Sequence, residues 1–142
     1  MEFIYNDGGR IASGFKGTTG DCVTRAIAIA TDKPYKEVYD ALNQLAESER
    51  TGKRKKKVSN SRTGVFRVTY EKYLKSLGWR FVPTMQIGKG CTVHMRADEL
   101  PKGIIICRLS RHLTTVIDGV AHDMYDPSRS GTRCVYGYFI KE

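Results

Sequence analysis

The sequence predicts a single α+β domain, with helices in the first half of the chain and an antiparallel sheet in the second half. Up to about residue 77, apolar residues recur at the three- and four-residue spacing of helices that bury one face. Beyond that point, short apolar runs alternate with turn residues, which is typical of strands. The length of 142 residues suits one domain.

Three helices are expected in the first half of the chain. A short strand at 2–5 and a glycine-rich, irregular loop at 6–21 precede them. Pro34 ends the first helix because proline restricts the residue before it, and Gly78 supplies a C-terminal stop for the third. The expected helices span residues 22–31, about 35–48 and about 65–77.

The second half contains up to six expected strands, because apolar runs there are short and end at turn residues. Asp118-Gly119 is a strong hairpin signal, since both residues tolerate a positive φ. The expected strands span residues 79–82, 92–96, 104–109, 112–117, 120–125 and 134–140.

The composition limits the class of protein. With 40% hydrophobic residues the chain can build a core, so a wholly disordered chain is excluded. No apolar run approaches the roughly 18 residues of a membrane span, and residues 1–20 lack the apolar block of a signal peptide. We therefore expect a cytoplasmic protein with no membrane partner.

Most of the net charge of +9 lies in one short basic segment. The basic residues there are Arg50, Lys53, Arg54, Lys55, Lys56 and Lys57. Such a run predicts a mobile, solvated loop, at about 50–63, with no share in the core. Phosphates attract basic clusters, but no aromatic residue interleaves this one, so docking on nucleic acid is an alternative and not the favoured role.

The four cysteines form no CxxC pair. Without a secretory signal we expect reduced thiols. Cys91 and His94 have the spacing of half a zinc site, but no second pair of similar form exists, so we expect no metal and no cofactor.

The sharpest feature for chemistry is Gly20-Asp21-Cys22 at the start of the first helix. Unpaired N–H groups and the helix dipole favour an anion there, which lowers the pKa of a thiol and favours a developing oxyanion. Gly20 lets the chain or a substrate pass close to the sulfur. The alternative is a small buried cysteine at a helix start capped by Asp21.

A nucleophilic cysteine needs a base, and His112 is the best placed of three histidines because it begins a strand at the rim of the sheet. The third, orienting group is Asp118, Asp123 or Asp126. A regular hairpin puts Asp123 diagonal to His112, whereas a bulge or a longer turn brings Asp126 opposite it. We favour Asp126, because it ends the strand beside His112.

These residues carry a resemblance. Asp21-Cys22 opening an alanine-rich helix, a late His112 and then Asp126-Pro127 resemble the papain-like cysteine peptidase superfamily. The pattern is most similar to that of the double-glycine leader peptidases of bacteriocin exporters. Gly20-Asp-Cys-Val-Thr-Arg-Ala26 also resembles the cysteine box of ovarian-tumour-type deubiquitinases, and the whole chain resembles small uncharacterised bacteriophage and prophage proteins.

The resemblance implies a papain-like fold and a thiol hydrolase that acts on a peptide or protein substrate. The leader peptidases have a glutamine oxyanion donor six residues before the cysteine, where this chain has Lys16. The ovarian-tumour type has an aspartate three residues before the cysteine, where this chain has Thr19. Lys16 and Thr19 are therefore the oxyanion candidates, with Thr18 and Asn6 as further donors. The alternative function is an inactive papain-like binding module that docks on nucleic acid or an acidic host protein through Lys53, Arg54, Lys55, Lys56 and Lys57.

Overall fold

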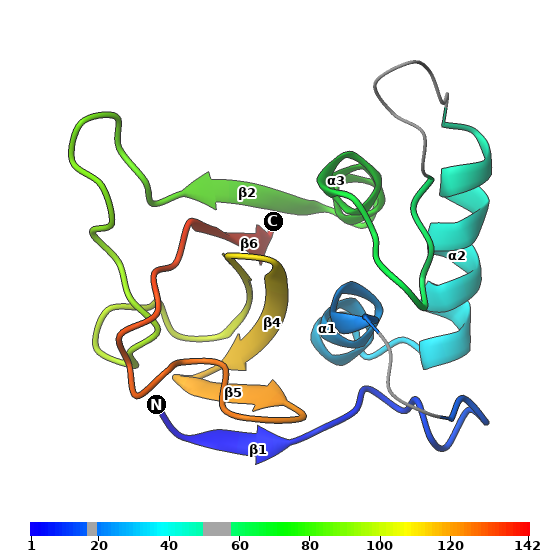
Figure 1. The fold of residues 1–142 in the computed structure, drawn as a ribbon, viewed down its shortest axis with the longest axis horizontal. Coiled ribbons are helices and arrows are strands. Elements are labelled where there is room, and N and C mark those ends of the chain that lie inside the picture. The colour runs from blue at the N-terminus through cyan, green and yellow to red at the C-terminus, as the bar shows by residue number, and fades with distance from the viewer. Residues whose placement is uncertain (17–19, 50–57) are drawn as a thin grey trace.

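A computed structural model describes residues 1–16, 20–49 and 58–142 of the chain, and the fold is α+β as expected. Figure 1 shows the helices gathered on one side of a curved sheet. The elements are β1 (Phe3–Tyr5), α1 (Cys22–Thr31), α2 (Tyr35–Glu47), α3 (Arg67–Ser76), β2 (Trp79–Pro83), β3 (Ile104–Leu109), β4 (His112–Ile117), β5 (Val120–Asp123) and β6 (Gly137–Lys141).

The sheet has six strands in the order β1-β5-β4-β3-β6-β2. All neighbours are antiparallel except β1 and β5, which run parallel. The β4–β5 hairpin turns on Asp118 and Gly119, with φ of 48° and 81°, and Ile117 pairs directly with Val120. Positive φ at both central residues marks the tight two-residue turn that suits the twist of a hairpin.

Helix α1 packs between the sheet and α2, and α3 packs against α2 and β2 (Figure 1). Helix α1 is apolar on nearly every side because it contacts β3, β4 and β5 as well as α2. Ile27 of α1, Leu74 of α3 and Ile106 of β3 are fully buried in the core that these elements share. These contacts place the first turn of α1 against the start of β4.

A second core covers the opposite face of the sheet. Val116 of β4 and Cys107 of β3 pack there against Met95 and Val135, which come from the long connections at 84–103 and 124–136. Figure 1 shows these connections on the side away from the helices. The strand expected at 92–96 does not form, and only an isolated bridge joins His94 to Cys134.

The polar segment after the second helix is partly built into the core, which corrects the expectation of a free loop at about 50–63. Ser59 and Ser61 are buried. The Ser61 hydroxyl donates to the Tyr39 carbonyl at 2.5 Å, and the Thr24 hydroxyl donates to the Ser61 carbonyl at 2.8 Å. These bonds anchor the segment to α1 and α2, because buried polar groups need partners. The basic residues 53–57 lie outside the described residues.

In the described parts of the chain, every helix is too short or too polar to cross a membrane.

Candidate active site

Cys22 is the first residue of α1, as the sequence predicted, and its side chain meets the start of β4. Burial raises the pKa of its thiol, but the hydrogen bond and positive charge of His112 oppose this effect. The Leu113 backbone N–H and the charge of Arg25 lower the pKa further, so that it lies below its ordinary value. The site therefore favours a thiolate, the form in which cysteine is a nucleophile.

His112 begins β4 and joins the cysteine to a carboxylate. Its Nε2 lies 2.7 Å from Oδ2 of Asp123, and both side chains are almost fully buried. Burial lowers the pKa of His112, but the hydrogen bonds and charges of Asp123 and Cys22 outweigh it and raise the pKa to about 9. Because Nε2 faces Asp123, Nδ1 is the nitrogen left for Cys22. The Tyr125 hydroxyl lies 3.5 Å from Nδ1.

The carboxylate that meets His112 belongs to Asp123, so the preference for Asp126 was wrong. The regular two-residue turn continues the β4–β5 register to place Asp123 opposite Thr114, on the same face of the hairpin as His112. The Thr114 hydroxyl also donates to Asp123 Oδ2 at 2.8 Å. Burial raises the pKa of Asp123, but its hydrogen bond to His112 and the charge of His112 bring the pKa below the ordinary value.

The other two aspartates serve local turns. Asp126 accepts from the backbone N–H and the hydroxyl of Ser128, at 2.9 and 2.7 Å. Asp118 accepts from the Gly103 backbone N–H at 2.8 Å. The bulge that would have turned Asp126 toward His112 is absent from the described β4–β5 pairing, because Ile117 pairs directly with Val120.

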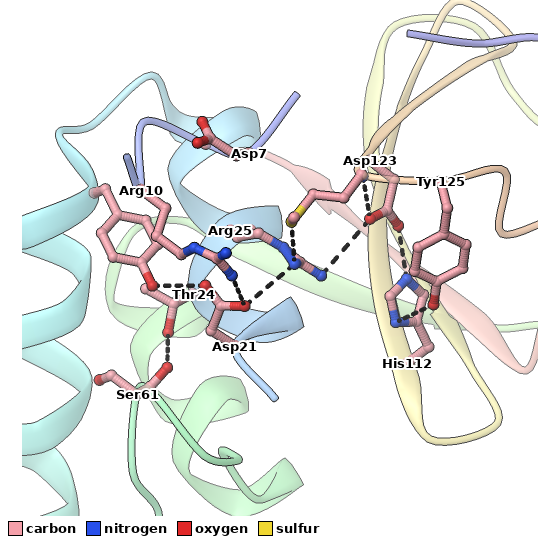
Figure 2. A network of polar contacts seen from close by, with 12 residues as sticks. Asp7, Arg10, Asp21, Thr24, Arg25, Ser61, His112, Asp123 and Tyr125 are labelled. Atoms are coloured by element: carbon pink, nitrogen blue, oxygen red, sulfur yellow. Dashed lines mark hydrogen bonds and ion pairs between the residues drawn. The ribbon is translucent and has the colours of Figure 1, made fainter. Parts of the chain in front are cut away.

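A buried network of polar side chains also contacts the Asp123 carboxylate (Figure 2). Arg25 of α1 reaches Asp21 at 3.2 Å and Asp123 at 3.7 Å. Asp21 also accepts from Arg10 at 3.3 Å and from the Tyr35 hydroxyl at 2.7 Å. Asp21 therefore does not cap α1 with its side chain, and instead it holds the arginine that contacts Asp123.

Sequence reasoning missed this network. The available signal was the four-residue spacing of Asp21 and Arg25, which places the two side chains on one face of a helix start. Nothing in the sequence indicated that Arg10 and Tyr35 would close around the same carboxylate, because both come from other segments of the chain.

The segment before α1 comes close to the chain at residue 63. A β-carbon added to Gly20 would lie 2.7 Å from the Thr63 carbonyl oxygen, so only glycine fits there. The sequence predicted a close approach at Gly20, and the partner is this backbone. Lys16 is exposed, and its carbonyl accepts from Arg62 at 2.8 Å. Asn6 accepts from the Gly8 N–H, and Thr18 and Thr19 lie outside the described residues.

An open cleft of about 760 Å³ lies beside the cysteine. Cys22 and His112 both line it, together with Gly20, Tyr70 and Tyr125. Cys22, His112 and the start of α1 thus meet at one open cleft. The free N–H groups of the first helical turn can stabilise an oxyanion there.

The expectation that all four cysteines are reduced thiols was wrong. Cys91 and Cys134 form a disulfide. Antiparallel hydrogen bonds, from Met95 N–H to the Arg133 carbonyl and from Val135 N–H to the Val93 carbonyl, align the two segments that carry them. Cys107 is free and fully buried, and burial raises its pKa to about 12. Cys22 is thus the one free thiol of the described residues that reaches a cleft.

Comparison with known proteins provides no family for the chain, since no protein-family model, curated protein or solved structure matches it.

Proposed function

We propose that this protein is a thiol hydrolase with a papain-like fold that cleaves a peptide or isopeptide bond. The observation that carries the proposal is the chain of contacts through His112, which hydrogen bonds to Asp123 through Nε2 and to the Cys22 thiol on its other side. A nucleophile, a base and an orienting acid in this order form the catalytic arrangement of thiol hydrolases.

The first step is attack by the thiolate. A lowered pKa at Cys22 and a raised pKa at His112 favour the thiolate–imidazolium pair near neutral pH. The sulfur forms a bond to the carbonyl carbon of the substrate, and the carbonyl oxygen takes up negative charge. N–H groups of the first turn of α1 would stabilise that oxygen.

The second step releases the amine. The His112 imidazolium donates its proton to the leaving nitrogen, the C–N bond breaks, and Cys22 remains as a thioester. His112 then takes a proton from water, the resulting hydroxide attacks the thioester, and the acid and the thiolate are released. Asp123 keeps the imidazole oriented throughout and stabilises its charged form.

One observation favours the alternative of an inactive binding module. The position of the glutamine donor in the similar leader peptidases is occupied by Lys16, which is exposed. Such a module would retain the fold and dock through the basic segment 53–57. It would not need an activated thiol, so the reactivity of Cys22 distinguishes the two functions.

The test is acylation by a small activated ester. p-Nitrophenyl acetate should acetylate Cys22 rapidly near pH 7, as detected by peptide mass spectrometry, and release p-nitrophenolate over repeated turnovers. His112→Ala should remove this reaction, and Cys107→Ala should leave it unchanged. Acetylation of Cys22 no faster than that of glutathione would refute the hydrolase and favour the binding module.

A further inference from the structure

The cleft beside Cys22 is strongly basic. Five arginines and no aspartate or glutamate occur among the described residues that line it. The arginines are Arg10, Arg25, Arg67, Arg108 and Arg111. Like charges in one cleft raise the local concentration of anions, so this lining favours a negatively charged substrate.

Three of these arginines already neutralise carboxylates of the protein. Arg10 and Arg25 pair with Asp21 at 3.3 and 3.2 Å. Arg67 pairs with Glu71 one turn further along α3. The positive charges of Arg10, Arg25 and Arg67 are therefore balanced by carboxylates of the protein itself. Arg111 is exposed at the β3–β4 turn, with a φ of 55°.

Arg108 differs from them because it meets no carboxylate in the described part of the chain. Its guanidinium lies 6.0 Å from the ring centre of Phe81 and 5.9 Å from that of Tyr136. Phe81 in turn lies over Gly137, where an added β-carbon would come within 2.1 Å of the ring. Aromatic rings attract the cation and restrict its position, but they leave its charge uncompensated.

Arg108 also lines the cleft that Cys22 and His112 share. It pairs across β3 and β4 with Leu113, whose backbone N–H binds the Cys22 sulfur. Tyr70 links the two sites electrostatically. Burial raises the pKa of its hydroxyl, the charge of Arg108 opposes this rise, and the charge of Cys22 adds to it. Arg108 thus lies in the same cleft as the nucleophile and within electrostatic reach of the same tyrosine.

We propose that Arg108 determines specificity by binding a carboxylate of the peptide substrate next to the bond that is cleaved. The inference rests on the proposed hydrolase function and adds its substrate class, acidic peptides. A guanidinium presents a planar fork of N–H donors that matches a carboxylate. The carboxylate belongs to an aspartate or glutamate side chain or to the C-terminus of the peptide.

The first experiment uses two alkylating reagents that differ in charge. Iodoacetate carries a carboxylate and iodoacetamide does not. The rate of Cys22 alkylation by iodoacetate is divided by its rate with iodoacetamide, and this ratio is divided by the same ratio for glutathione. The normalised ratio measures how strongly the cleft attracts an anion. Arg108→Gln should lower this normalised ratio about tenfold, the effect expected for one lost charged hydrogen bond. Arg80→Gln is the matched control, because Arg80 is exposed, pairs with Glu142 and lies outside the cleft.

The outcomes separate this inference from the function on which it rests. A normalised ratio that Arg108→Gln leaves unchanged, with Cys22 still fast toward iodoacetamide, overturns the role of Arg108 and leaves the hydrolase standing. Cys22 as slow as glutathione toward both reagents overturns the hydrolase and this inference together.

The second experiment identifies the source of the carboxylate. Fluorogenic tetrapeptide libraries, varied at each position, test side chains, and peptides ending in a free acid or an amide test the C-terminus. A preference of about tenfold for one acidic form, lost in Arg108→Gln and reversed toward lysine in Arg108→Glu, supports the proposal. Equal cleavage of acidic and neutral peptides by the unmodified protein overturns it.

Discussion

The guanidinium of Arg25 lies 3.7 Å from the carboxylate of Asp123, and this ion pair joins α1, which begins at Cys22, to β5, which ends at Asp123. Arg25 is one turn into α1, and it also holds Asp21 directly before Cys22. The pair therefore links the first turn of α1, which begins at Cys22, to the carboxylate that binds His112. Figure 2 shows Arg25 between Asp21 and Asp123.

Replacing Arg25 should destabilise the fold. Arg25→Met leaves Asp123 without its ion pair to α1 and removes one partner of Asp21, so the free energy of unfolding should fall by about 3 kcal/mol. Urea denaturation followed by circular dichroism measures the change. Lys36→Gln, which removes an exposed pair with Asp40, should change stability by less than about 0.5 kcal/mol. Equal effects of the two variants would contradict the structural role of Arg25.

Asp123 and Asp126 should differ sharply in their effect on Cys22. Asp123→Asn removes the charge that stabilises the imidazolium, so the apparent pKa of Cys22 alkylation by iodoacetamide should rise by about one unit or more. Asp126→Asn is the matched control, because Asp126 bonds only with Ser128 among the described residues. If the pKa of Cys22 alkylation rises in the Asp126 variant and stays unchanged in the Asp123 variant, Asp126 and not Asp123 orients His112.

The rate of amide hydrolysis should follow a bell-shaped pH profile. It rises with pH as Cys22 loses its proton, at a pKa below that of an ordinary thiol. It falls as His112 loses its proton near pH 9, because a neutral imidazole cannot donate to the leaving amine. Asp123→Asn should move the falling limb to lower pH, since loss of the carboxylate lowers the pKa of His112. The profile of kcat/KM between pH 5 and 10, on a fluorogenic peptide, provides the measurement.

The thiols should titrate in three distinct classes. Protein purified without reductant should show one fast thiol, Cys22, in a colorimetric disulfide-exchange assay. Denaturation should expose Cys107 as a second, and reduction should release Cys91 and Cys134. Mass spectrometry after alkylation assigns each class. Four thiols in the denatured, unreduced protein would show that the disulfide is not formed.

Several parts of the structure were predictable because local sequence dictates them. Alanine- and isoleucine-rich residues after Gly20-Asp21 specify a buried helix that begins at Cys22, and Pro34 and Gly78 limit the neighbouring helices. Asp118-Gly119 specifies a tight turn, since both residues adopt positive φ readily. From these elements alone, Cys22 and His112 could be selected as partners.

The choice between Asp123 and Asp126 needed more than local sequence. Both follow the same turn and both could approach His112, so the answer depended on whether the β4–β5 ladder contained a bulge. Because Ile117 pairs directly with Val120, the ladder contains no bulge there, and Asp123 is the aspartate that lies next to His112. Cys22 and His112 were therefore predictable as neighbours, and the carboxylate that His112 meets was not.

By itself, the sequence determined the α+β class, the helix that starts at Cys22 and the hairpin that carries His112, because helix and turn preferences act over a few residues. Only the tertiary structure decided that Arg25 joins Asp21 to Asp123, that Cys91 meets Cys134, and that Arg108 lines the same cleft as Cys22. Each of these contacts depends on which segments become neighbours in the sheet and its connections. That arrangement is set by packing of the whole core, which no short stretch of the chain encodes.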